Sequence, residues 1–144
     1  MRSAIICDLD GTLCNIDHRI HLVKQNKWDE FYDLCSKDTL NEWCAELLDL
    51  YATHLYDILL VSGRPEKVRH KTENWLKNNG ILYKDLITRA DGDYCPDDEL
   101  KEKIYRYHIE PYYRVAVVID DRQRVVDMWR RLGLVCLQCT KGDY

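Results

Sequence analysis

Residues 5–15 read IICDLDGTLCN and decide the fold, because an apolar run leads directly into two aspartates. The two isoleucines favour a buried strand. Burying a carboxylate without a partner is costly, so Asp8 and Asp10 are expected where the strand leaves the sheet or faces a cation. The stretch therefore predicts a strand whose carboxyl end carries a charged site.

Apolar runs alternate with helical patterns along the rest of the chain. Strands are predicted at residues 3–9, 57–63, 115–120 and 134–139, with a weaker candidate for a short edge strand at 82–89. Helices are predicted at residues 39–51, 65–80, 97–109 and 123–132. Nearly all-apolar strands that alternate with single helices are typical of a parallel sheet covered on both faces. The predicted fold is one α/β domain, residues 1–144, of the doubly wound, Rossmann-like type.

Local signals predict two helix starts and one insertion. Thr39 and Glu42 have the spacing of a capping box, and Pro65 suits the first position of a helix. The stretch between the first two strands, residues 15–56, is longer than a crossover needs. Its first part, residues 15–38, is therefore predicted to form a flap over the site, and we call it the flap segment.

Composition limits the classes of protein that fit. The formal net charge is −4, so no global basic field would hold a long polyanion without specificity. No apolar stretch approaches the about 20 residues of a membrane span, and the N-terminus lacks a signal-peptide pattern. The seven cysteines are an odd number scattered over helix-like and strand-like segments, which suits thiols in a reducing compartment. We expect a soluble, cytoplasmic protein with no membrane partner.

Polar signatures follow three of the predicted strands: DLDGT, SGR and DDR. The carboxyl ends of parallel strands lie on one edge of a sheet, where ligands of such folds bind. The side chains expected to meet there are Asp8, Asp10, Ser62, Arg64, Asp120 and Asp121. Each motif alone has an ordinary explanation as a turn or helix cap, but together they predict a site for a phosphate and a metal.

The residue types in this set indicate phosphoryl transfer. The four aspartates form an all-oxygen cluster, which favours Mg²⁺ as the cofactor. The Ser62 hydroxyl, the adjacent Gly63 amide and the Arg64 guanidinium can bind a phosphoryl group. A lysine, Lys101 or Lys103, could add a point charge, and spacing alone does not choose between them. One aspartate would attack the phosphorus and the other would protonate the leaving oxygen.

The order DLDGT, VSGR, a helical lysine and IDDR resembles the motifs of the haloacid dehalogenase (HAD) superfamily of aspartate-nucleophile phosphatases. The resemblance implies that Asp8 is the nucleophile and Asp10 the general acid and base, with Asp8, Asp10, Asp120 and Asp121 at the metal. It prefers Lys101, by its offset from Asp120, and places Ser62, Gly63 and Thr12 at the phosphoryl group. It also assigns substrate contacts to Arg19, Arg64 and Arg89, of which only Arg64 could be suspected from the residues.

Nearly the whole chain from Ile5 is similar to the phosphatase domains of phage polynucleotide kinase/phosphatases, a family that removes 3′-phosphates from DNA or RNA ends during repair. The resemblance implies such ends as substrate and a possible homodimer. It does not decide whether DNA or RNA ends are preferred. The chain has no G-x-x-x-x-G-K-[ST] loop, so we expect no kinase domain and no 5′-kinase activity.

Two alternatives fit parts of the pattern. The acidic net charge suits a HAD phosphatase for mononucleotides or other small phosphomonoesters. A phospho-accepting signalling domain also places aspartates and a lysine around Mg²⁺, but Asp10 is spaced to help break a phosphoaspartate, which argues against a persistent one.

Overall fold

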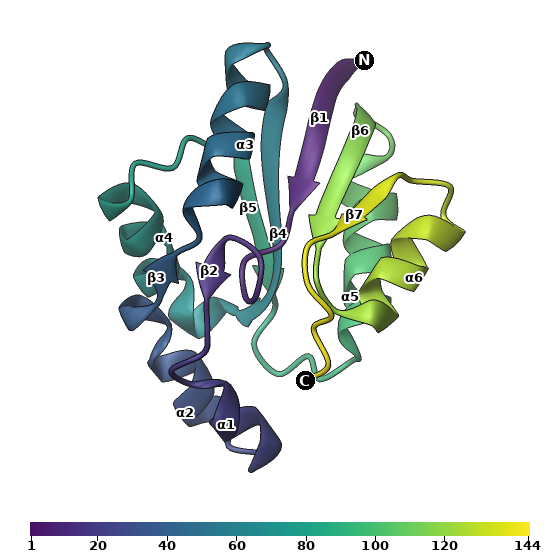
Figure 1. Ribbon diagram of the computed structural model, residues 1–144. Helices are drawn as coiled ribbons and strands as arrows, with labels where there is room; N and C mark the ends of the chain where they lie inside the picture. Colours follow the sequence, from purple (N-terminus) through teal and green to yellow (C-terminus); the bar gives the residue numbers. More distant parts are fainter.

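A computed structural model describes residues 1–144 and contains one five-stranded parallel sheet in the order β5-β4-β1-β6-β7 (Figure 1). The strands are β1 (Arg2–Cys7), β4 (Asp57–Pro65), β5 (Asp85–Arg89), β6 (Tyr113–Asp120) and β7 (Cys136–Gln138). The weak candidate, β5, is an edge strand as expected. The predicted doubly wound α/β fold is confirmed.

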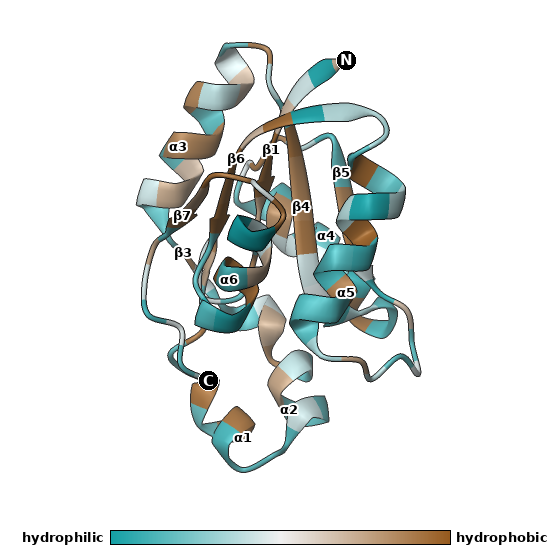
Figure 2. Ribbon diagram, turned by 90° about the vertical axis from the view of Figure 1, so that its right-hand side faces the viewer, coloured by the Kyte–Doolittle hydropathy of each residue, from teal (hydrophilic) through white to brown (hydrophobic).

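Two pairs of helices cover the two faces of the sheet, each over its own hydrophobic core. Helices α3 (Glu42–Thr53) and α4 (Arg69–Asn78) pack on the core that contains Ile5 and Cys7 of β1. Helices α5 (Asp97–Ile104) and α6 (Gln123–Arg131) pack on the core that contains Ala4 and Ile6. Alternate residues of β1 thus face opposite helix layers, as the strand period requires. Figure 1 shows this division, with α3 and α4 on one side of the strands and α5 and α6 on the other. Figure 2 shows that the central strands are largely apolar and that the helices carry many hydrophilic residues.

The chain reverses its direction of travel across the sheet at β1, which lies between β4 and β6. The carboxyl ends of these three strands form the crevice where doubly wound folds bind ligands. The flap segment lies beyond this edge and contains α1 (Ile20–Lys24) and α2 (Trp28–Asp33) (Figure 1). Its two ends are joined by a small antiparallel ribbon of β2 (Cys14–Asn15) and β3 (Thr39–Leu40).

Both predicted helix starts are wrong. Thr39 pairs with Asn15 in the β3–β2 ribbon, and the N-cap of α3 is Asn41. The Asn41 side chain forms no cap but donates to the Thr12 carbonyl, which ties the start of α3 to the DLDGT loop (2.8 Å). Pro65 is instead the last residue of β4. A short 3-10 turn, Glu66–Val68, follows it and separates it from α4. Tertiary pairing has overridden the local signals in both places.

The helix predicted at 97–109 is divided into α5 and a π-helical turn at Tyr105–Ile109, which places the buried Ile109 in the core.

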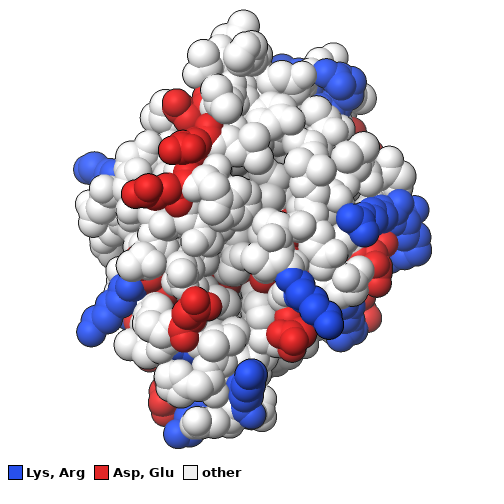
Figure 3. All heavy atoms as spheres, viewed as in Figure 1, with Lys and Arg blue, Asp and Glu red and all other residues white.

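Figure 3 shows basic and acidic side chains interspersed around the rim of one face, with few charges at its centre. None of the helices is both long and apolar enough to span a bilayer.

Candidate phosphatase site

Asp8 directly follows β1 and is held by groups from three other segments. Its amide donates to the Ile119 carbonyl of β6, so the residue continues the ladder (3.0 Å). Lys101 of α5 donates from Nζ to Asp8 Oδ1 and to Asp120 Oδ2, at 2.8 and 3.0 Å. The Thr12 hydroxyl donates to Asp8 Oδ2 at 3.2 Å. Lys101 is buried and Lys103 is exposed, so the structure brings Lys101 to the acids.

Asp8, Asp120 and Asp121 form a buried cluster in which one carboxylate oxygen of each lies within 4.8 Å of the others. Burial and the negative charge of Asp120 raise the pKa of Asp8 well above its usual range, although Lys101 opposes the shift. Burial and Asp120 also raise the pKa of Asp121 to about 6. Asp121 Oδ1 has no hydrogen-bond partner. Three carboxylates with one lysine and an unpaired buried oxygen fit a hard divalent cation.

Asp10 lies in a different environment, among buried arginines. Its Oδ1 accepts from Arg19 Nη2 at 2.7 Å and from Arg64 Nε and Nη2 at 3.0 and 2.6 Å. Asp38 completes the network: its Oδ1 accepts from Arg19 Nε, and its Oδ2 accepts from both arginines. His18 Nε2 also lies 2.6 Å from Asp38 Oδ1. The DLDGT loop, the flap segment and β4 are therefore joined by one ionic network, which we call the arginine network.

The arginine network holds Asp10 as an anion. Burial opposes its ionisation, but the charges of Arg64 and Arg19 outweigh that effect and lower the pKa of Asp10 to about 2. At neutral pH a carboxylate in this state is ionised, so it can accept a proton but has none to donate. The two aspartates of D-x-D thus have opposite environments, one with a raised pKa and the other with a lowered one.

The end of β4 brings Ser62 and Gly63 to the same edge. Both line a small chamber together with Asp8 and Lys101. The Ser62 hydroxyl accepts from the Arg64 amide at 3.1 Å, which orients it. A Cβ at Gly63 would lie 2.6 Å from Asp97 Oδ1, so the glycine allows α5 to approach β4 closely.

Arg89, at the end of β5, is placed next to the chamber and not beside Asp8. Its Nη1 donates to the Asp93 and Cys95 carbonyls at 3.1 and 2.6 Å, and its Nη2 donates to Asp97 Oδ1 at 2.5 Å. Asp97 Oδ2 in turn accepts from Arg122 Nη1 at 2.8 Å. In this structure Arg89 therefore organises the loop after β5 and leaves Asp8 to other residues.

Tyr144 contacts the site. The sequence alone would predict that its segment, KGDY, is a solvent-exposed terminus. Its hydroxyl donates to the Asp10 carbonyl at 2.7 Å, and its ring stacks on Arg122 with 5.0 Å to the ring centroid. Gly11 makes room for this approach, with φ of +83° and no side chain to meet Asp121.

The chamber that Tyr144 lines has a volume of about 20 Å³, room for one or two water molecules. A phosphoryl group is larger, so one bound here would need side chains that line the chamber to move.

Sequence reasoning missed Asp38, Asp97 and Tyr144. Asp38 carries no motif, since it follows the flap helices among exposed polar residues. Asp97 was visible only as an acid in the first turn of a helix, where the helix dipole accounts for it. A tyrosine in a short polar segment gives no signal of burial. These three contacts form between segments far apart in sequence.

Comparison with known proteins agrees with this geometry. The family model described as the polynucleotide kinase PNKP phosphatase domain matches residues 2–144. A protein of Autographa californica nuclear polyhedrosis virus, with the provisional name bifunctional polynucleotide kinase/RNA ligase, is 32% identical over 146 residues, which cover 98% of this chain and 20% of that protein. A chain of the solved Pnkp1/Rnl/Hen1 complex is 35% identical with a TM-score of 0.89, and the match covers 100% of this chain and 48% of that one.

A class C acid phosphatase from Bacillus anthracis shares the fold at 17% identity, with a TM-score of 0.67 and coverage of 99% of this chain and 68% of that one. The chain spans less than half the length of the more similar relatives.

Proposed function

We propose that this chain, which belongs to the family of polynucleotide kinase PNKP phosphatase domains, hydrolyses terminal 3′-phosphates of DNA or RNA in nucleic-acid end repair. The observation that carries the proposal is the contact of Lys101 with both Asp8 and Asp120 at the switch point of the sheet. This contact puts an attacking carboxylate and a fixed positive charge beside Ser62 and Gly63.

In the proposed reaction an Asp8 oxygen attacks phosphorus, and the bond from phosphorus to the 3′ oxygen breaks with its electron pair. That oxygen takes the proton of a protonated Asp10 and leaves as the 3′ hydroxyl, so Asp10 becomes a carboxylate and Asp8 becomes a phosphoaspartate. Lys101 and Ser62 stabilise the charge on the phosphoryl oxygens. Asp10 then removes a proton from a water molecule that attacks phosphorus, which releases phosphate and restores Asp8.

Mg²⁺ is the proposed cofactor, and Asp8, Asp120 and Asp121 would hold it. When bound, it supplies positive charge to the phosphoryl oxygens and offsets the three carboxylates. The arginine network keeps Asp10 ionised for the second step. For the first step Asp10 must carry a proton, and its pKa of about 2 makes that state rare at neutral pH.

The decisive experiment compares kcat/KM in Mg²⁺ for a 3′-phosphorylated oligonucleotide, its 5′-phosphorylated isomer and 3′- and 5′-mononucleotides. We expect the 3′-phosphorylated oligonucleotide to be preferred over all three. A preference for mononucleotides would favour a small-molecule phosphatase instead. A stable phosphoprotein without turnover would favour a signalling domain.

Replacing Asp10 by asparagine is expected to lower turnover by about 10²- to 10⁴-fold, because the group that activates water is lost. Asp8 remains, and a leaving group such as p-nitrophenolate needs no proton from Asp10. Phosphoenzyme should therefore accumulate on mixing with p-nitrophenyl phosphate, and intact-protein mass spectrometry after an acid quench would detect it. The matched control is the Asp8→Asn/Asp10→Asn double variant, which should show no added phosphate. Full turnover by Asp10→Asn would remove Asp10 from the mechanism.

Replacing Asp121 by asparagine is expected to stabilise the metal-free protein and to abolish its stabilisation by Mg²⁺. Folding raises the pKa of Asp121 to about 6. Above that pH the ionised carboxylate destabilises the folded protein, and this destabilisation disappears as the pH falls toward the ordinary pKa of an aspartate in the unfolded chain. Metal at about 100 times its Kd should stabilise the parent by about 2.7 kcal/mol. Thermal unfolding at pH 7.5 with and without about 10 mM Mg²⁺ measures both effects. An equal Mg²⁺ shift in both proteins would place the metal elsewhere.

The homodimer and the cytoplasmic location expected from the sequence stay predictions. So does the single-domain organisation without a kinase, because the relatives are considerably longer than this chain. The names of those relatives make RNA ends a reasonable first substrate to test beside DNA ends.

A further inference from the structure

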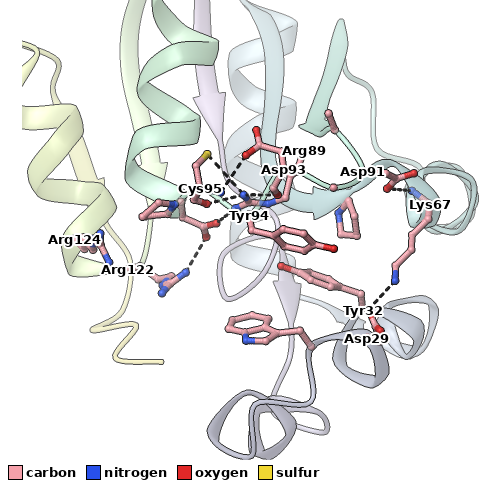
Figure 4. Close-up of a pocket in the computed structure, with 16 residues that line it drawn as sticks. Asp29, Tyr32, Lys67, Arg89, Asp91, Asp93, Tyr94, Cys95, Arg122 and Arg124 are labelled. Carbon is pink, nitrogen blue, oxygen red and sulfur yellow. Dashed lines mark hydrogen bonds and ion pairs between the residues drawn. The ribbon is translucent and has the colours of Figure 1, made fainter.

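A second, larger pocket of about 500 Å³ adjoins the chamber and has no part in the steps above (Figure 4). Trp28, Tyr32, Asp97 and Arg122 line both this pocket and the chamber, so the two spaces are neighbours. Its volume is within the range of sites for small organic groups. A group attached to a phosphate in the chamber would therefore enter this pocket first.

Aromatic side chains from two different segments line the pocket. Trp28 and Tyr32 of α2 stack on each other at 5.9 Å between ring centroids with 30° between planes, and they form one wall. Tyr94, from the loop after β5, lies across from Tyr32 (Figure 4). Tyr94 is 92% exposed and forms no hydrogen bond, and Trp28 is 37% exposed. Large aromatic faces left open to solvent at a pocket mark a binding site more often than a packing one.

The loop that carries Tyr94 is braced. Arg89 donates to the carbonyls of Asp93 and Cys95 on either side of it. The Cys95 amide also donates to Asp93 Oδ1 at 3.0 Å. The ring is thus presented by a fixed backbone, which lowers the entropy cost of binding a flat ligand against it.

The charges around the pocket are balanced. The basic residues in its lining are Lys67, Arg89, Arg122 and Arg124, and the acidic ones are Asp29, Asp91, Asp93 and Asp97. Lys67 already pairs with Asp29 at 2.7 Å, and Arg122 pairs with Asp97. A run of backbone phosphates would need an excess of basic residues. The lining instead suits an uncharged, flat group.

We propose that this pocket binds the terminal nucleoside of the substrate, with its base stacked between Tyr94 and the wall formed by Trp28 and Tyr32. The inference rests on the proposed function, because it starts from a 3′-phosphate in the chamber. Stacking uses the π-face that every base has, so the pocket recognises the presence of a base and tolerates its identity. It thereby distinguishes a nucleotide 3′-phosphate from a phosphomonoester that lacks a base.

The test uses two oligonucleotides with a 3′-phosphate, identical except that one has an abasic terminal residue. The wild-type protein is expected to favour the base-bearing substrate by about 5- to 150-fold in kcat/KM. Tyr94→Ala should bring this ratio close to 1, mainly through KM, and Tyr94→Phe should retain it. Tyr107→Ala is the matched control, since Tyr107 is 73% exposed and does not line the pocket.

A spectroscopic measurement reports on stacking without turnover. An oligonucleotide with 2-aminopurine at the 3′ terminus is titrated with the Asp8→Asn variant, and stacking should quench its fluorescence. Adding Tyr94→Ala should remove most of that quenching, and adding Tyr107→Ala should not.

Equal kcat/KM for the two substrates, or a ratio that Tyr94→Ala leaves unchanged, would overturn the inference while the proposed function stands. Absence of turnover with both oligonucleotides would overturn the proposed function and the inference with it.

Discussion

Replacing Asp8 by asparagine is expected to reduce hydrolysis of a 3′-phosphorylated oligonucleotide by at least about 10⁴-fold, because an amide cannot form the phosphoaspartate. The change should leave the protein folded. The asparagine oxygen can still accept from Lys101. The Thr12 hydroxyl, which donates to the other carboxylate oxygen of Asp8, can instead accept from the amide nitrogen. It also removes one of three clustered carboxylates, whose mutual repulsion and burial raise the pKa of Asp8.

Initial rates under saturating substrate measure the loss, and thermal unfolding checks the fold. Asp17→Asn serves as the matched control, because Asp17 is an exposed aspartate of the flap segment whose carboxylate has no ionic partner. Appreciable turnover by Asp8→Asn, with Asp17→Asn at the parent rate, would mean that another group attacks phosphorus.

Replacing Asp38 by asparagine is expected to destabilise the protein by about 3–5 kcal/mol, the cost of removing one partner from a buried ion pair. The Asp38 carboxylate is fully buried and lies 2.6 Å from Arg19 Nη2 and 3.1 Å from Arg64 Nη2. Without its charge, two buried guanidinium groups share the single carboxylate of Asp10. Neither arginine can lose its proton to escape this cost.

Urea unfolding followed by circular dichroism gives the free energy for the parent, for Asp38→Asn and for the control Asp33→Asn. Asp33 is exposed on α2 and has no ionic partner, so its substitution should change stability by less than about 0.5 kcal/mol. A loss below about 1 kcal/mol in Asp38→Asn would show that the arginine network contributes little to stability.

The sheet and its charged edge were predictable because they depend on local patterns and one topological rule. Apolar runs give buried strands, and parallel strands put their carboxyl ends on the same edge. That rule was sufficient to predict that Asp8, Ser62 and Asp120 lie close together, although they span more than one hundred residues of the sequence. Helix starts were less predictable, since Thr39 and Pro65 follow tertiary pairing instead of local capping.

The sequence by itself determined the doubly wound fold, the acidic cluster and the residues proposed to bind phosphate, because each depends on which residues end a strand. Only the tertiary structure showed, without reference to relatives, that Lys101 and not Lys103 contacts Asp8. It also paired the buried Arg19 with Asp38. In the same way, it placed the Arg89 side chain against the loop that follows β5. Only the tertiary structure joined Tyr94 to the α2 aromatics across a pocket. These arrangements depend on how the flap segment and the loop after β5 pack on the sheet edge, and packing between distant segments leaves no periodic trace in a sequence.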